Sequence, residues 1–129
     1  MENQTLVKEI CPTKTQEWIK NGAILVDVRE ADEVANLAFD VPNLINIPLS
    51  IFEERFIKIP KNKEVILVSK TGSKSLRATG FLVNHGYDKV ANMKHGILRW
   101  VQKGFPTKGD VNSVIQNDNL SCCSSSSCC

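Results

Sequence analysis

Short apolar runs rich in β-branched residues alternate along this chain with segments typical of helices. Residues 24–26 and 65–68 are continuous apolar runs, as in strands that are buried on both faces. Residues 44–47, closed by Pro48, form a third candidate strand, and residues 90–93 form a weaker fourth. Strands that alternate with helices predict an α/β fold, in which helices cover both sides of a mainly parallel central sheet.

Five helical segments surround these strands. Four of them carry apolar side chains on a helical pattern, and the short one that starts at Ala31 begins with acidic residues, which favour a helix N-terminus. Gly22, Gly86 and Gly104 stand where three of the helices should stop, and Ser50 is a candidate cap. We therefore expect helices over residues 13–20, 31–37, 50–57, 73–85 and 97–103.

The size and charge of the chain limit what it can do. Its 129 residues suffice for one domain and are too few for two of ordinary size. A net charge of +2 gives no support for binding to nucleic acid or to a membrane surface. No stretch approaches the roughly 18 apolar residues of a membrane helix, and the polar N-terminus predicts no secretory signal. We expect a cytoplasmic, monomeric protein without a cofactor or a metal site.

The character of the chain changes after residue 109. The last twenty residues are polar and end in four serines between two pairs of cysteines, Cys122 with Cys123 and Cys128 with Cys129. We expect a single domain over residues 1–109 and a disordered Ser/Cys-rich tail over residues 110–129. The remaining cysteine, Cys11, stands far away, so the spacing does not fit a disulfide framework spread through a core.

The loop of residues 69–75 joins a predicted buried strand to a predicted helix. A helix start leaves backbone N–H groups unpaired and carries a partial positive charge, so a turn at this place attracts anions. Lys70 and Lys74 add full positive charges. The further hydroxyl donors are Thr71, Ser73 and Ser75. The loop therefore predicts a pocket for a small oxyanion or a charged sulfur group.

The same loop could also be a phosphate-binding P-loop or an ordinary strand-to-helix turn. A P-loop is excluded, because Ser73 rather than a lysine follows Gly72, and Leu67 stands where the first glycine should be. An ordinary turn, capped by a serine or threonine, accounts for the loop by itself equally well. The rest of the chain has to decide between the turn and the anion pocket.

A series of short motifs stands in a fixed order between about residues 5 and 106. The motifs are Leu25-Val26-Asp27-Val28-Arg29-Glu30, Ile45-Asn46-Ile47-Pro48-Leu49, Gly72-Ser73-Lys74-Ser75 after its strand, Gly86-Tyr87 before Val90, and Gly96-Ile97-Leu98-Arg99-Trp100 before Gly104-Phe105-Pro106. Each motif is weak alone. Together, their order and spacing resemble the rhodanese-like domain family.

This resemblance implies a rhodanese-like three-layer fold and sulfurtransferase chemistry. In the family a cysteine thiolate takes a sulfane sulfur from a thiosulfate-type donor, and the persulfide passes it to a thiol or another thiophile. The implied partners are thus a small sulfur donor or anion and a thiol acceptor, with a partner protein as a further option. The basic residues of the family's loop fall at Lys70 and Lys74, and its glycine falls at Gly72. The resemblance also implies that Asp27 braces the loop and that Arg29 pairs with a nearby acid.

Ser69 occupies the position at which the family carries its nucleophilic cysteine. A serine cannot form a persulfide, because a persulfide needs a sulfur–sulfur bond. The loop can lower the pKa of a thiol, but it cannot make a serine hydroxyl an alkoxide near neutral pH. No His–Asp pair is evident that would activate Ser69 as a hydrolase nucleophile. We therefore predict that the chain as written does not transfer sulfur.

Three hypotheses for Ser69 stay open at the level of the sequence. The chain is a natural non-catalytic member that keeps the loop for binding, or it carries a deliberate Cys→Ser replacement. In the third hypothesis the tail cysteines supply the missing sulfur chemistry or carry a soft metal such as Cu(I) or Zn²⁺. The loop length, six residues from Ser69 to Lys74, resembles the sulfur-handling members rather than the related phosphatases and arsenate reductases, whose loops are longer.

Overall fold

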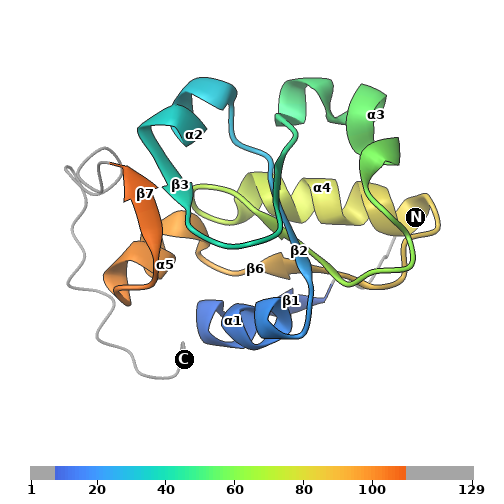
Figure 1. Cartoon of the computed structure of the whole chain (residues 1–129). Helices are drawn as coiled ribbons and strands as arrows, with labels where there is room; N and C mark the ends of the chain where they lie inside the picture. Colours follow the sequence, from blue (N-terminus) through green and yellow to red (C-terminus); the bar gives the residue numbers. More distant parts are fainter. Residues whose placement is uncertain (1–7, 110–129) are drawn as a thin grey trace.

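A five-stranded parallel sheet organises the chain (Figure 1). The computed structural model describes residues 8–109, and neighbouring strands follow the order β1-β6-β5-β2-β4, each pair parallel. The apolar runs predicted from the sequence form the three central strands, which are buried on both faces. The strands are β1 (Glu9–Ile10), β2 (Ile24–Asp27), β4 (Leu44–Asn46), β5 (Val65–Val68) and β6 (Val90–Met93).

Helices cover both faces of this sheet, which confirms the predicted three-layer α/β fold. One face is covered by α1 (Pro12–Lys20) and α5 (Gly96–Gln102), and the other by α3 (Phe52–Arg55) and α4 (Ser73–Asn84). The short helix α2 (Ala31–Asn36) follows β2 and has no buried residue. Among residues 8–109, no helix combines the length and the apolar character needed to cross a membrane.

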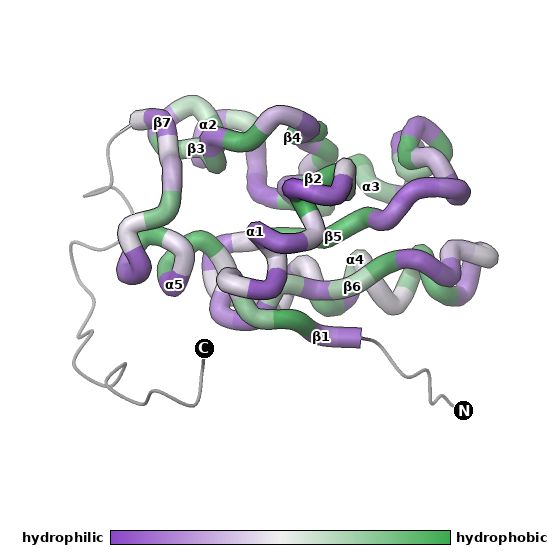
Figure 2. Tube along the Cα trace, turned by 60° about the horizontal axis from the view of Figure 1, so that its bottom comes forward, coloured by the Kyte–Doolittle hydropathy of each residue, from purple (hydrophilic) through white to green (hydrophobic). Residues whose placement is uncertain are grey.

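The sheet divides the hydrophobic core into two clusters. Successive side chains of a strand point to opposite faces. Ile66 of β5 therefore packs with Trp100 on the side of α1 and α5, whereas Leu67 packs with Leu82 on the side of α4. Figure 2 shows the hydrophobic colour along β5, preceded by a hydrophilic segment. Burial on both faces fixes the register, because a shift by one residue would exchange the two clusters.

Short strands outside the predicted set complete the fold. β1 lies at one edge of the main sheet, and β3 (Leu37–Phe39) pairs with β7 (Thr107–Gly109) in a separate antiparallel ribbon. Leu37, expected to end a helix, instead begins β3, because its side chain and that of Phe39 are buried in the core beside Trp100. Strands of two or three residues carry too little periodicity to be recognised in a sequence.

The helix expected over residues 50–57 is interrupted. It consists of the 3₁₀ turn η1 (Leu49–Ile51), helix α3 and the 3₁₀ turn η2 (Phe56–Lys58). Ser50 does not cap it, and its hydroxyl instead donates a hydrogen bond to Glu30 over 3.3 Å. The Tyr87 hydroxyl lies 2.6 Å from the carbonyl oxygen of Ile59 and draws the end of this segment onto the core. Tertiary contacts thus override the helical pattern.

The carboxyl ends of all five parallel strands lie at one edge of the sheet. The loop after β5, the turn after β6 and the segment after β2 gather at this edge, where α/β proteins bind their ligands. In the pairing registers, Asp27 lies opposite Val68, and Leu67 lies opposite Asn92. The predicted tail, residues 110–129, and the first seven residues of the predicted domain lie outside the described residues.

Candidate active-site and anion-binding loop

The loop between β5 and α4 alternates between buried and exposed residues. Ser69 is 2% exposed and Ser75 is fully buried, and both lie against the sheet, whereas Lys70 and Lys74 are exposed. Gly72 turns the chain between them with a φ of +100°. A side chain there would stand 3.0 Å from the backbone nitrogen of His95 in addition to the strained φ, so the turn requires glycine.

Ser69 lies at the base of the loop with its hydroxyl oxygen turned inward. This oxygen accepts a hydrogen bond from the Gly72 N–H over 2.9 Å and a longer one from the Ser75 N–H over 3.4 Å. The Ser75 hydroxyl oxygen lies 3.0 Å away. The atom at position 69 therefore has two backbone N–H donors, an environment that stabilises an electron-rich sulfur or oxygen.

The start of α5 is hydrogen-bonded to the backbone of the loop. The Ile97 N–H donates to the carbonyl of Ser69 over 2.9 Å, and the Leu98 N–H donates to the carbonyl of Lys70 over 3.2 Å. Gly96 permits this approach, because a Cβ at that position would lie 2.3 Å from the Lys70 carbonyl oxygen. The start of α5 thus holds two carbonyl groups of the loop, those of Ser69 and Lys70.

Several backbone N–H groups of the loop have no acceptor among the described residues. They belong to Lys70, Thr71, Ser73 and Lys74. The first two precede Gly72 and the last two open α4, a helix of twelve residues, so they lie around one turn beside two exposed lysines. Such a group of amides can bind one small anion. The structure thus places all seven predicted loop residues together.

Asp27 and Arg29 form a buried ion pair. The Arg29 Nη2 lies 2.7 Å from the Asp27 carboxylate, and Nε lies 3.0 and 3.1 Å from its two oxygens. The same Nη2 donates to the carbonyl of Leu37 over 2.7 Å. Arg29 thus finds its expected acid, and that acid is Asp27.

Among residues 8–109 the Asp27 carboxylate has no hydrogen bond to the loop, so its expected role as a brace stays a prediction. The Asp27 carboxylate bonds to Arg29. Asp27 lies beside Val68, whose side chain packs with the core under α1 and α5, whereas Ser69 contacts α4. The ion pair therefore supports the turn after β2 and strand β3. Its link to β5 runs through the backbone, from the Val28 N–H to the Val68 carbonyl.

Two polar residues near the loop were missed in the sequence. Asn92 is 1% exposed and bonds to the Ser75 hydroxyl, to the carbonyl of Gly72 and to the carboxylate of Glu9. A polar residue inside an otherwise apolar strand was the available signal for Asn92. Nothing in the sequence marked Glu9, because β1 has only two residues.

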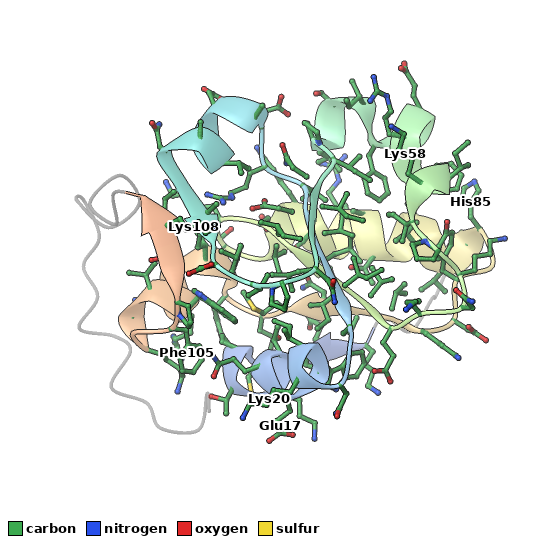
Figure 3. All side chains as sticks on the ribbon, viewed as in Figure 1. Glu17, Lys20, Lys58, His85, Phe105 and Lys108 are labelled. Carbon is green, nitrogen blue, oxygen red and sulfur yellow. The ribbon has the colours of Figure 1, made fainter. Side chains whose placement is uncertain are left out.

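The two histidines lie in different places. His95 follows β6 and adopts a left-handed conformation, with φ +68°, directly behind Gly72. Burial, together with the charges of Arg99 and Lys94, lowers the pKa of His95. His85 lies at the far end of α4 (Figure 3). Neither is hydrogen-bonded to Ser69, and residues 8–109 hold no group of three or more His, Cys, Asp and Glu side chains arranged for a metal.

The fold agrees with the comparison to known proteins. Residues 12–103 match the family model described as the rhodanese-like domain, and the chain belongs to this family. A sulfurtransferase from Allochromatium vinosum is 31% identical over 83 residues, which cover 64% of this chain and 76% of the relative. Thiosulfate sulfurtransferase 18 from Arabidopsis thaliana is 32% identical over 106 residues, which cover 73% and 78%.

Solved structures support the same fold. A rhodanese-related protein from Thermoplasma volcanium superposes with a TM-score of 0.71 at 27% identity, over 80% of this chain and 99% of that protein. The polysulfide-sulfur transferase homodimer from Wolinella succinogenes gives a TM-score of 0.72 at 20% identity, over 88% and 84%. At that identity the second match concerns the fold alone.

Proposed function

We propose that this chain keeps the scaffold of a sulfurtransferase but does not transfer sulfur while position 69 is a serine. The observation that carries the proposal is the position of the Ser69 hydroxyl oxygen. It lies at the carboxyl end of β5 and accepts the N–H of Gly72 over 2.9 Å, at the start of a loop flanked by exposed lysines. A sulfur atom there would be held by the same donors.

The missing step follows from the chemistry of sulfur. A thiolate attacks the sulfane sulfur of thiosulfate, a sulfur–sulfur bond forms, and sulfite leaves with the bonding electrons. A serine has no sulfur and would have to lose its hydroxyl proton first. Among the described residues, the groups bonded to Ser69 Oγ are two backbone amides and the hydroxyl of Ser75, and none of them is a base. Serine nucleophiles elsewhere depend on such a base.

The decisive experiment restores the sulfur. Ser69→Cys should convert thiosulfate and cyanide into thiocyanate far faster than the unaltered chain, which should stay at background. Ser73→Cys is the matched control, because it places a thiol four residues further on, at an exposed position whose hydroxyl bonds to Thr71. If Ser69→Cys stays at background with several sulfur donors, or if Ser73→Cys is equally active, the sulfurtransferase scaffold is refuted.

A second candidate function is the binding of an anion or of an anionic group on a partner protein. The four loop N–H groups without an acceptor among residues 8–109 favour it, together with Lys70 and Lys74. This function needs no sulfur at position 69. It would suit a natural non-catalytic member of the family, and the residue that the source gene encodes at position 69 distinguishes that case from a deliberate replacement.

Titration with thiosulfate or sulfate, followed by NMR, tests the binding function. The amide signals of residues 70–74 should move, and Lys74→Ala should weaken the apparent affinity. Lys58→Ala is the control, because Lys58 is exposed near the opposite end of α4 (Figure 3). Amide signals that do not move, or equal losses in the two variants, would rule out a specific anion site in the loop.

The third hypothesis, sulfur or soft-metal carriage by the tail, stays a prediction. Cys122, Cys123, Cys128 and Cys129 lie outside the described residues. Removal of residues 121–129 should abolish thiol-dependent metal uptake and leave the fold intact. Unchanged metal stoichiometry after the truncation would exclude the tail as the carrier.

A further inference from the structure

We infer that Glu9 controls the acidity of the group at position 69 through a hydrogen-bond chain that begins at its exposed carboxylate and runs over the buried side chains of Asn92 and Ser75. The inference rests on the proposed sulfurtransferase scaffold, since a cysteine at position 69 is the group whose acidity matters there. Glu9 lies outside residues 12–103, the part of the chain that matches the family model. Glu9 acts as a positioning residue, because it is hydrogen-bonded to Asn92 and does not contact the group at position 69.

The hydrogen bonds form a continuous series from Glu9 to Ser69. The Glu9 carboxylate accepts a hydrogen bond from Asn92 Nδ2 over 2.9 Å. Asn92 Oδ1 accepts the Ser75 hydroxyl over 2.5 Å, and the Ser75 hydroxyl oxygen lies 3.0 Å from that of Ser69. Asn92, Ser75 and Ser69 are each at most 2% exposed, so water does not compete for these bonds inside the chain.

The pairing of strands brings Glu9 to this place. In the parallel register of β1 and β6, Glu9 lies directly opposite Asn92, and Leu67 of β5 lies opposite Asn92 on its other side. Side chains at paired positions share a face of the sheet. Ser69 lies two residues beyond Leu67, on the same face, where Ser75 of α4 meets it. An outer strand is thereby connected to the loop across β6.

The carboxylate determines where each proton lies. A carboxylate only accepts hydrogen bonds, so Asn92 must turn its NH₂ group toward Glu9 and its oxygen toward Ser75. The same NH₂ group also donates to the carbonyl of Gly72 over 3.2 Å. The Ser75 hydroxyl has two acceptors in reach, Asn92 Oδ1 at 2.5 Å and the Gly72 carbonyl at 3.2 Å, and its single proton goes to the nearer one, Asn92. The Ser75 oxygen is then left to accept the proton of Ser69. The Gly72 carbonyl favours the same orientation over its longer hydrogen bond, and the Glu9 carboxylate reinforces it with the shorter, charged one.

This orientation of the hydrogen bonds opposes ionisation at position 69. The Ser75 hydroxyl would be a third donor to a thiolate at that position, but it donates to Asn92 instead, and the negative charge of Glu9 strengthens Asn92 as an acceptor. The charge of Glu9 also repels a thiolate directly. Both effects have the same sign. Glu9 therefore keeps a thiol at position 69 less acidic than the donors of the loop alone would make it.

Other charges act on position 69 from the elements packed around it. The cations are Lys70 and Lys74 on the loop, with Lys94 and Arg99 after β6. His95 lies on the same turn, and the charge of Arg29 is matched by that of Asp27. These cations favour a thiolate and are the same in all the variants below. Glu9 also acts on His95, whose pKa it raises, so Glu9→Gln lowers the pKa of His95 further, whereas the lysines and arginines stay the same.

The test measures the pKa of a thiol at position 69 in the full chain, with Ser69→Cys as the parent. Alkylation by iodoacetamide at a series of pH values, followed by trypsin, gives the rate for peptide 64–70, which contains the introduced thiol and none of the native cysteines. Glu9→Gln should lower this pKa by about 0.3–1 unit. Glu64→Gln is the matched control, because it removes one exposed carboxylate before β5, at the opposite end of the strand from the loop.

A third substitution separates the hydrogen-bond chain from simple charge repulsion. Ser75→Ala removes one buried hydroxyl and interrupts the chain with little change in volume. In that background the effect of Glu9→Gln should become smaller, because only the direct charge repulsion remains. An equal effect with and without the Ser75 hydroxyl, or an effect of Glu9→Gln no larger than that of Glu64→Gln, would overturn the inference.

These pKa values do not depend on turnover. If Ser69→Cys fails to transfer sulfur but its thiol pKa responds to Glu9 as described, the proposed function is refuted and the hydrogen-bond chain stands. If Ser69→Cys transfers sulfur but its thiol pKa does not respond to Glu9→Gln, the role of the hydrogen-bond chain is refuted and the proposed function stands.

Discussion

Gly96→Ala should separate the start of α5 from the active-site loop. A Cβ built at Gly96 lies 2.3 Å from the carbonyl oxygen of Lys70 and 2.4 Å from that of Ser69. These neighbours are backbone atoms in a buried turn, so they cannot rotate away as the end of a flexible side chain could. Either the loop or the start of α5 has to move.

The magnitude of the destabilisation can be worked out from three effects. A φ of +62° costs an alanine about 1 kcal/mol, and overpacking in a tight interior costs about 1–3 kcal/mol. Movement also weakens two hydrogen bonds, from Ile97 to Ser69 and from Leu98 to Lys70, each worth about 1 kcal/mol. With partial relaxation, we expect a loss of about 3–5 kcal/mol in the free energy of unfolding.

Urea denaturation followed by circular dichroism measures this loss, and Gly104→Ala is the control. Gly104 has a similar φ of +74°, but nothing lies within 4 Å of its added Cβ. It should therefore lose only the backbone cost of about 1 kcal/mol. The difference between the two variants isolates the contact between α5 and the loop. Equal losses in both variants would refute this account of how the loop is held.

Other predictions concern the ion pair and the histidine. Arg29→Ala leaves Asp27, which is fully buried, without its cation, and should cost about 3–5 kcal/mol in urea denaturation, whereas Arg29→Lys should cost less because it keeps the charge. For His95, burial first and then Arg99 and Lys94 lower the pKa, so the folded state binds fewer protons than the unfolded one. The contribution of neutral His95 to the free energy of unfolding is complete above about pH 6.5, the pKa of histidine in the unfolded chain. This contribution is lost as the pH falls toward the lower pKa of His95 in the folded protein. Asparagine tolerates the left-handed conformation of residue 95. The His95→Asn variant should therefore lose less stability than the unaltered protein between pH 7 and pH 5. Equal losses in the two proteins would contradict this.

Local patterns in the sequence were enough to locate the parts of the site that are near one another in the chain. The buried run of residues 65–68, the turn at Gly72 and the helix start at Ser73 follow from β-branched composition and turn chemistry. Ser69 could be aligned with the family's cysteine because the order of the motifs is preserved. The predicted helix over residues 50–57 failed, because Tyr87, far along the chain, decides how that segment ends.

What the sequence by itself determined is therefore the α/β class, the loop of residues 69–75 and the absence of sulfur at its first position. Only the tertiary structure decided which side chains surround that position. The Asp27 carboxylate has its partner in Arg29, and Glu9 is linked to the loop through Asn92 because β1 pairs with β6 in one particular register. The physical reason is range. Propensity and periodicity act over a few residues, whereas the contact from Glu9 to Asn92 joins residues 83 positions apart and exists only once the sheet has formed.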